Sequence, residues 1–136
     1  MATRGLIAIE NKDGSIEAIY NHNDSYPEYL MDVLNKHYIS ERKVRQAIAL
    51  GDASIIAPML ETNEPHSFNE PCPGVSIFYA RDYGAKATLS LRFESFDELI
   101  RKHNRFYIVD YIYVFKDGEW LGYNVRSKEF IRSKNV

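Results

Sequence analysis

The sequence has little that would crosslink a protein, anchor it in a membrane or give it a strong charge. Its 136 residues include one cysteine, Cys72, which excludes an internal disulfide framework and is compatible with a reducing compartment. No apolar run approaches the ~20 residues that a membrane-spanning helix needs. The apolar stretch within residues 1–10 is too short for a signal peptide, and an acidic residue follows it directly. We therefore expect a protein that acts in the cytoplasm, without contact with a membrane.

Charge of one sign is also scarce. Residues 1–68 hold ten acids and six bases, and residues 69–136 hold nine acids and eleven bases, so the two halves carry −4 and +2. The net charge of +2 on residues 69–136 is too small for a nucleic-acid-binding surface, and we expect no direct binding of nucleic acid. The acidic half is too mild to mimic DNA by bulk charge. Such mimicry would require carboxylates arranged in space.

Two common signatures of catalysis are missing as well. The seven glycines are scattered, and none opens a helix in the pattern of a phosphate-binding loop. Cys72 lies between Pro71 and Pro73, with no histidine at a spacing typical of cysteine nucleophiles.

The composition is that of one ordinary globular domain, with 45% hydrophobic and 26% charged residues. Residues 6–10 and 15–21 read as two strands joined by an Asp-Gly turn. Helices are predicted over residues 26–38 and 41–50, and together they would form a helical hairpin. Ser25 and Glu28 have capping-box spacing for the first helix, although Pro27 leaves Tyr26 as an alternative cap. Ser40 and Gly51 would begin and end the second.

The second half of the chain alternates strands with one further helix. Residues 61–74 form a polar, proline-rich loop that we predict to be flexible. Strands are predicted over residues 75–80, 87–93, 106–115 and 119–125, with a capping box at Ser95 and Glu98 before a helix that ends near His103. Residues 126–136 would add an edge strand or fray. The prediction is a single α+β domain over residues 1–136, with an antiparallel sheet and the order ββ-αα-ββ-α-ββ.

The densest polar chemistry lies at the end of the second predicted strand. His22 and Asp24 could ligate a metal, or act as a general base with its orienting group. A metal would need further ligands, for which His66, Asp82 and His103 are the obvious candidates, but no spacing joins them. The alternative is that Asp24 or Ser25 caps the helix and that His22 bonds to the turn. We therefore predict no catalytic residue, no metal and no cofactor.

Two further groups complete the candidate binding residues. Arg81 and Asp82 lie in a predicted turn, where Arg81 could hold an anion or Asp82 could simply bond to the backbone. Tyr107, Tyr111 and Tyr113 share one face of a predicted strand and could form an exposed aromatic platform. The predicted binding residues are His22, Asp24, Tyr26, Arg81, Asp82, Tyr107, Tyr111 and Tyr113.

Several stretches together resemble one protein family. Residues 18–30 are similar to the pattern "aIYcHwDgYPe" of a family of small phage and prophage proteins. Residues 33–38 and 43–54 continue the resemblance, residues 79–84 resemble its "y-x-R-D-x-G-e" turn, and residues 111–120 resemble its closing hairpin. The departures are Asn23 for an aromatic residue, Ser25 for glycine and Ala85 for an acid.

The resemblance implies a phage-borne accessory protein that is made in the host cytoplasm. Such proteins often bind and block a host defence component, including CRISPR effectors, so the resemblance favours binding over catalysis. The alternative is a small enzyme or a ligand sponge that acts on a nucleotide-like molecule through His22, Asp24, Arg81 and Asp82. A virion or regulatory accessory protein is a third reading. The expected partner is a host protein or defence complex, and a homo-oligomer is compatible with the sequence.

Overall fold

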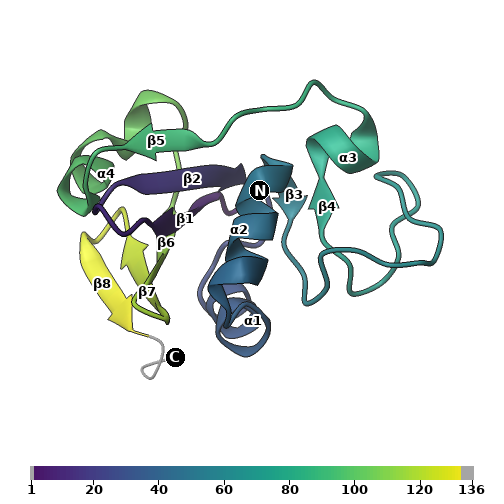
Figure 1. Ribbon diagram of the computed structural model, residues 1–136, viewed down its shortest axis with the longest axis horizontal. Coiled ribbons are helices and arrows are strands. Elements are labelled where there is room, and N and C mark those ends of the chain that lie inside the picture. The colour runs from purple at the N-terminus through teal and green to yellow at the C-terminus, as the bar shows by residue number, and fades with distance from the viewer. Residues whose placement is uncertain (1, 133–136) are drawn as a thin grey trace.

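A mixed β-sheet with helices on both faces organises the chain. A computed structural model describes residues 2–132. Within them eight strands form one sheet, in the order β4-β3-β2-β1-β6-β7-β8, while β5 pairs with β2 (Figure 1). The strands are β1 (Gly5–Glu10), β2 (Ile16–Asn21), β3 (Ala53–Ile55), β4 (Ile77–Phe78), β5 (Leu91–Phe93), β6 (Tyr111–Lys116), β7 (Glu119–Asn124) and β8 (Glu129–Arg132). The helices are α1 (Leu30–His37), α2 (Glu41–Leu50), α3 (Tyr79–Tyr83), α4 (Phe96–Lys102) and the short 3-10 helix η1 (His103–Arg105).

The α+β class predicted from the sequence is confirmed, but the sheet is not wholly antiparallel. β1 runs parallel to β6, and β2 meets β3 in parallel at the pair of Asn21 with Ala53. The order along the chain is ββ-αα-β-β-α-β-α-β-β-β, which places α3 after the two-residue strand β4. The parallel pairs arise because the helices carry the chain across the sheet between the paired strands.

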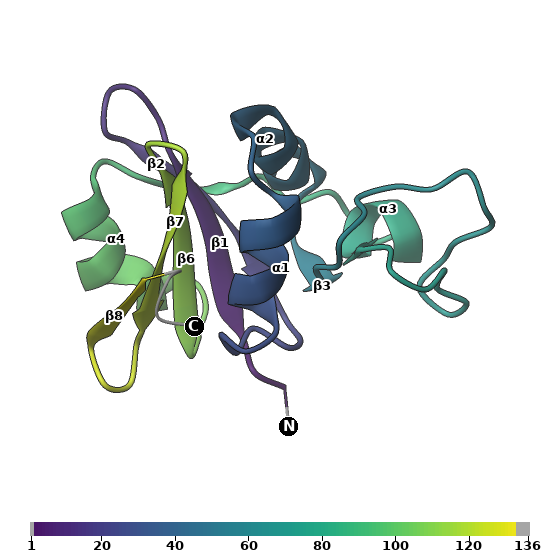
Figure 2. The ribbon, with the colours of Figure 1, turned by 90° about the horizontal axis from the view of Figure 1, so that it is seen from below.

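Each face of the sheet has its own hydrophobic core. Ile7 and Ile19 pack with α1 and α2 on one face, whereas Leu6 and Ala18 pack with α4 on the other. Figure 2 shows the two helix layers on opposite sides of the strands. Alternation of side chains along each strand explains this division, since consecutive residues point to opposite faces. β6 is therefore buried on both sides, as its continuous apolar run predicts.

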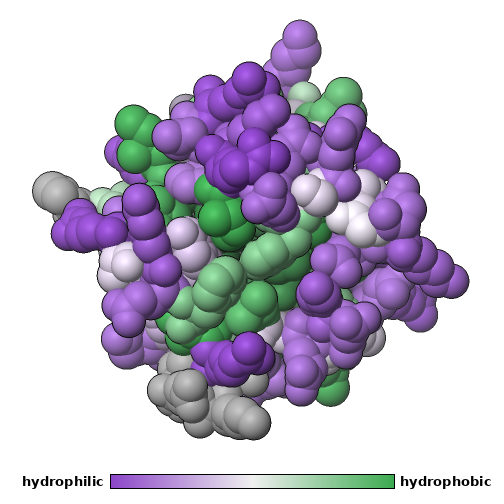
Figure 3. Space-filling model, turned by 90° about the vertical axis from the view of Figure 1, so that its left-hand side faces the viewer, coloured by the Kyte–Doolittle hydropathy of each residue, from purple (hydrophilic) through white to green (hydrophobic). Residues whose placement is uncertain are grey.

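The second core is partly open at the surface. Apolar side chains gather in the middle of the face that carries α4 and β8 (Figure 3). Phe96 of α4 stacks on Phe130 of β8 with ring centroids 6.0 Å apart, and Phe130 meets Tyr123 at 5.0 Å. Phe130 itself is 51% exposed. These aromatic contacts join α4 to the β7–β8 hairpin.

Local signals place several elements where the sequence predicts them. In the first hairpin the Asp13 carboxylate accepts hydrogen bonds from the Ser15 backbone and hydroxyl, and Gly14 adopts φ +88°. α2 spans the predicted residues, with the Ser40 hydroxyl accepting from the Lys43 amide. Ser95 caps α4 as predicted, since its hydroxyl accepts from the Glu98 amide, while the Glu98 carboxylate accepts from the Glu94 amide and not from the Ser95 amide. The edge strand expected in the C-terminal tail is β8.

The first helix begins later than predicted and without the predicted cap. α1 starts at Leu30, behind a turn in which the Leu30 amide donates to the Tyr26 carbonyl. Ser25 is fully buried, and its hydroxyl accepts a hydrogen bond from the Asn21 side chain instead of from the helix. Asp24 does not cap the helix either, because no side chain of residues 2–132 bonds to the start of α1; its backbone turns to φ +57° three residues after the end of β2.

Ser25 is buried against Gly5 of the neighbouring strand, which makes the pair testable. A Cβ added at Gly5 would lie 2.8 Å from both the Cβ and the Oγ of Ser25. We expect Gly5→Ala to destabilise the fold by about 1–3 kcal/mol through overpacking. Ser25→Gly would remove the obstructing atoms, so the double variant should recover part of that loss in denaturant unfolding. An additive loss in the double variant would show that this contact does not limit the packing.

Three predicted strands are shorter than expected. Of residues 106–115 only the part from Tyr111 is paired in the sheet, and Phe106 and Ile108 are exposed. Residues 87–93 are paired only over β5. Residues 75–80 shorten to β4, and the predicted turn at residues 81–84 is the helix α3, which Gly84 ends at φ +80°.

Residues 58–84, here called the lobe, project from the sheet at the end opposite α4 (Figures 1 and 2). The lobe holds β4, α3 and the predicted loop 61–74, which has no helix or strand. The predicted flexibility of this loop remains a prediction. Among the described residues no helix is both long and apolar enough to cross a membrane.

Candidate functional site

The turn after β2 is fixed to β3 by its backbone. The amides of His22 and Asn23 donate to the carbonyls of Ala53 and Ser54 at 3.0 and 2.9 Å. The Asn23 side chain adds a further bond to the Ser54 carbonyl. Of the predicted binding residues in this turn, His22 and Asp24 are partly buried and Tyr26 is 39% exposed. The turn is a rigid part of the sheet end.

His22 is engaged by a neighbouring tyrosine. Its Nδ1 lies 2.8 Å from the hydroxyl of Tyr20, and the two rings are tilted with centroids 5.8 Å apart. Within residues 2–132 no carboxylate bonds to His22, so Asp24 does not orient it as a general base would require. The predicted pair therefore does not form an acid–base unit.

Asp52 is the residue that sequence reasoning missed. Its carboxylate accepts a 2.5 Å hydrogen bond from the hydroxyl of Tyr107 and a 3.0 Å bond from the backbone amide of Tyr20. The rings of Tyr20 and Tyr107 stack with centroids 4.3 Å apart. Asp52 thus fastens residues 106–110, here called the strap, to the end of β2. The sequence marked Asp52 only by its position directly after Gly51, the glycine that ends α2.

This cluster is electrostatically suited to structure and not to proton transfer. Burial raises the pKa of the Tyr107 phenol, and its hydrogen bond to the Asp52 carboxylate and the charge of Asp52 raise it further. Burial also raises the pKa of Tyr20. Both phenols stay protonated near neutral pH, and the Asp52 carboxylate is occupied by two donors. What the arrangement does is hold the strap.

The three predicted platform tyrosines do not form a platform. Tyr113 is fully buried, and its hydroxyl donates to the Ser25 carbonyl at 2.6 Å. Tyr111 is partly buried beside it on the face of α1 and α2. Tyr107 lies with the opposite core, on the face of α4. The strand prediction was wrong for residues 106–110, and Tyr107 therefore lies on the face opposite to Tyr111 and Tyr113.

Arg81 and Asp82 lie at the centre of the lobe. The Arg81 guanidinium lies 2.9 Å from the Asp82 carboxylate and donates to the carbonyls of Leu60 and Ser76 at 2.6 and 3.0 Å. Asp82 also accepts from the backbone amide of Phe78. Its side chain is only 5% exposed. An anion would have to displace this carboxylate, so the pair serves first to join the segments of the lobe.

His66 completes this network from the long loop. Its Nδ1 accepts a hydrogen bond from the Cys72 amide at 2.9 Å, so its Nε2 carries the proton in the neutral ring. Nε2 lies 3.1 Å from the Ser76 carbonyl and 3.5 Å from the Asp82 carboxylate. The Phe68 amide donates to the Asp82 carbonyl. The loop is therefore tied to β4 and α3 at several points.

The charge of Asp82 makes the stability of the lobe depend on pH. Burial raises the pKa of Asp82, but hydrogen bonds from Arg81 and from the Phe78 amide outweigh it, and the pKa lies below its ordinary 3.8. Because the folded pKa is the lower one, the stabilisation is complete above pH 3.8 and is lost as the pH falls through the folded value. We expect the difference in unfolding free energy between wild type and Asp82→Asn to shrink in that acidic window. A constant difference down to the lowest accessible pH would contradict the ion pair.

The side chains of His22 and Arg81 make their hydrogen bonds with different neighbours, Tyr20 for the first and Leu60, Ser76 and Asp82 for the second. No hydrogen bond or ion pair in residues 2–132 joins His22 or Asp24 to Arg81 or Asp82. Only His66 and Asp82 of the proposed metal ligands come together. Across the described part of the chain, no three His, Cys, Asp or Glu side chains are grouped to hold a metal ion.

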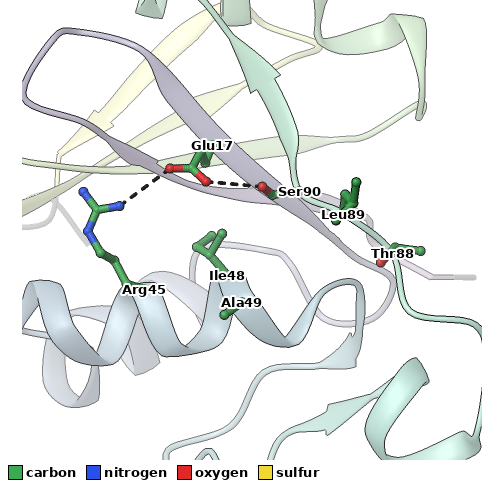
Figure 4. A pocket seen from close by; sticks show the side chains of 7 residues that line it. All are labelled: Glu17, Arg45, Ile48, Ala49, Thr88, Leu89 and Ser90. Atoms are coloured by element: carbon green, nitrogen blue, oxygen red, sulfur yellow. Dashed lines mark hydrogen bonds and ion pairs between the residues drawn. The ribbon is translucent and has the colours of Figure 1, made fainter.

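A groove lies between α2 and the segment before β5. It has a volume of about 320 Å³ and is lined by Glu17, Arg45, Ile48, Ala49, Thr88, Leu89 and Ser90 (Figure 4). The Glu17 carboxylate lies 3.7 Å from Arg45 and accepts from the Ser90 hydroxyl at 3.4 Å. The charged groups of the groove thus already neutralise one another.

Comparisons with known proteins add no assignment. No family model, no curated protein and no solved structure matches this chain.

Proposed function

We propose that this protein is a phage accessory protein that binds and inhibits a host defence component in the host cytoplasm. The observation that supports binding over catalysis is the internal use of its reactive groups. His22 bonds to Tyr20, Asp52 to Tyr107, and Arg81 to Asp82. The phage origin is supported by the motifs at residues 18–30 and 79–84.

The lobe is the part of the molecule best suited to contact a partner. Loops of this length without secondary structure are commonly functional. Its network of hydrogen bonds fixes the loop before binding, which lowers the entropy that binding must overcome. Met59 and Tyr83 are 47% and 60% exposed and offer apolar contact area. In this reading Arg81 and Asp82 act by shaping the lobe.

The charge of the lobe indicates the chemistry of the partner. Glu61, Glu64 and Glu70 are exposed, while the one arginine of residues 58–84 is paired with Asp82. No lysine or arginine occurs in residues 46–80. A projecting element with this charge fits a basic groove. CRISPR effectors hold their nucleic acid in such a positively charged channel, which makes them the first candidates.

A purified panel of CRISPR effectors tests this proposal. We expect the wild-type protein to form a complex with at least one effector and to block its target binding. Glu61→Lys with Glu64→Lys and Glu70→Lys should weaken inhibition roughly tenfold or more, because attraction becomes repulsion. Glu94→Lys with Glu119→Lys and Glu129→Lys makes the same change of charge on exposed residues outside the lobe and is the matched control. Equal inhibition by both triple variants would refute the role of the lobe.

The ligand hypothesis has less support. It requires His22, Asp24, Arg81 and Asp82 to face one molecule, and their contacts lie within separate parts of the structure. A thermal-shift panel of nucleotides and divalent metals addresses it directly. A reproducible rise in melting temperature that His22→Ala abolishes would favour this alternative.

A further inference from the structure

Three aromatic rings gather where the long loop of the lobe meets α3 (Figure 1). The ring centroid of Phe68, in the loop, lies 4.6 Å from that of Tyr83 and 6.0 Å from that of Tyr79. Tyr79 and Tyr83 are the first and last residues of α3, and the three rings are here called the aromatic cluster. Tyr83 is 60% exposed, while Phe68 and Tyr79 are partly buried. The lobe therefore presents the Tyr83 ring to solvent, supported by two partly buried rings.

Backbone hydrogen bonds fix both segments that carry the aromatic cluster. The Phe68 amide donates to the Asp82 carbonyl at 3.0 Å, which ties the loop to α3 one residue before Tyr83. Phe68 also lies in a turn that two hydrogen bonds close. The Ser67 amide donates to the Glu70 carbonyl at 3.3 Å, and the Glu70 amide donates to the Ser67 hydroxyl at 3.1 Å. A backbone fixed in this way loses little conformational entropy when another group packs on the rings.

The charge around the aromatic cluster is negative. Glu70 is exposed in the same turn as Phe68, and residues 58–86 contain four acids and two bases, which gives a net charge of −2. One of the two bases, Arg81, is paired with Asp82. The other, Lys86, is exposed just after α3. A group that binds here therefore meets aromatic rings and an excess of carboxylates.

An arginine side chain matches both features. The face of an aromatic ring attracts a cation, and the planar guanidinium both stacks on such a face and binds carboxylates. The lobe already contains one arrangement of this kind, because the Arg81 guanidinium lies 5.1 Å from the Phe78 ring centroid while it pairs with Asp82. A neutral apolar side chain would use the rings and leave the carboxylates unused, and an anion would be repelled by them.

We propose that the aromatic cluster binds an arginine side chain of the partner, with the guanidinium on the Tyr83 ring and the Glu70 carboxylate as its counter-charge. The proposal rests on the proposed function, since it names the partner residue that the lobe recognises. Arginine is the preferred residue for nucleic-acid recognition, so a basic groove that holds nucleic acid offers such a side chain. Binding of the lobe would occupy an arginine that otherwise contacts the nucleic acid.

Titration of the purified protein with N-acetyl-L-arginine amide, followed by NMR of the aromatic signals, tests the proposal without an effector. We expect the signals of Tyr83 and Phe68 to shift with the arginine amide and to shift severalfold less with the citrulline amide, which has nearly the same shape and no charge. Tyr83→Phe keeps the ring and should retain the binding, whereas Tyr83→Leu should lose it. Tyr26→Leu, at a tyrosine 39% exposed after β2, is the matched control. Equal shifts with both amides, or no shift with either, would overturn the proposal.

Graded changes of ring and charge distinguish a cation–π contact from simple apolar packing. A series of Tyr83→Phe variants with an increasing number of fluorine atoms has a less negative ring face, so the affinity for the arginine amide should fall in steps, about two- to fivefold in total. Glu70→Gln should weaken this affinity and Lys86→Gln should strengthen it, whereas Glu94→Gln, outside the lobe, should leave it unchanged. An affinity that stays constant through the fluorine series or in Glu70→Gln would refute this mode of binding. If the protein binds an effector but not the arginine amide, the arginine site is wrong and the proposed function stands; if it binds the amide but no effector, the reverse holds.

Discussion

Replacing Arg81 by alanine is expected to open the lobe while the sheet stays folded. The change removes the bonds to the Leu60 and Ser76 carbonyls and leaves the Asp82 carboxylate, 5% exposed, without its cation. Hydrogen bonds to a charged group contribute about 1.5–3 kcal/mol each, so losing these bonds should cost about 3–5 kcal/mol, although the Arg81 side chain is itself 28% exposed. Hydrogen exchange should therefore accelerate in residues 58–78 and remain slow in β1 and β2. This is the largest effect that we expect from a single substitution.

Two variants control for charge and for packing. Arg101→Ala removes an exposed arginine paired with Asp97 on α4, and such pairs contribute less than about 1 kcal/mol. Arg81→Lys keeps the charge but loses the planar fork, so it should recover only part of the stability. If hydrogen exchange in Arg81→Ala rises equally across the whole sheet, or does not rise in the lobe, then the hydrogen bonds of Arg81 do not stabilise the lobe independently of the sheet.

Removal of the Asp52 carboxylate is expected to produce the second-largest effect. Asp52→Ala leaves the Tyr107 hydroxyl and the Tyr20 amide without their acceptor. Hydrogen bonds to a charged group contribute about 1.5–3 kcal/mol each, so we expect a loss of about 3 kcal/mol in denaturant unfolding. Because Asp52 raises the pKa of Tyr107, spectrophotometric titration of the variant should show a tyrosine that ionises at lower pH.

Two further variants distinguish the effect of losing the Asp52 carboxylate from general destabilisation. Asp52→Asn retains one acceptor oxygen and should lose less stability than Asp52→Ala. Asp97→Ala, on the exposed face of α4, should change stability by less than about 1 kcal/mol. An unchanged tyrosine titration in Asp52→Ala would mean that the carboxylate does not set the environment of Tyr107.

The parts of the fold that the sequence predicts well are those decided by near neighbours. The Asp13-Gly14 turn, the Ser40 cap and the Ser95 cap all depend on residues two or three positions apart. Such signals act through the local backbone and need no knowledge of the tertiary fold. The hairpins and the helix α2 followed from them directly.

The errors arise where a distant residue decides the outcome. Ser25 has the spacing of a helix cap, but its side chain is buried against Gly5 of the neighbouring strand. Its hydroxyl accepts a hydrogen bond from the Asn21 side chain instead. Residues 106–110 have the composition of a strand, but Asp52, 55 positions away from Tyr107, holds them outside the sheet. These partners are found only when the sheet order is known.

The candidate site was predicted in its composition and not in its arrangement. Arg81 and Asp82 do interact, yet they face inward to Leu60 and Phe78. His22 pairs with Tyr20 and not with Asp24. Groups that could have formed an active site are instead used to fix the lobe and the strap. That use leaves exposed carboxylates and apolar side chains as the features available to other molecules.

The most direct test of this account is inhibition of a purified CRISPR effector by matched triple variants. We expect the wild-type protein and the variant with lysines at positions 94, 119 and 129 to inhibit equally. The variant with lysines at positions 61, 64 and 70 should lose complex formation and inhibition together, with an unchanged unfolding transition. No complex and no inhibition by the wild-type protein across the common effector types would contradict the CRISPR form of the proposal. Equal loss in both triple variants would contradict the lobe as the binding element.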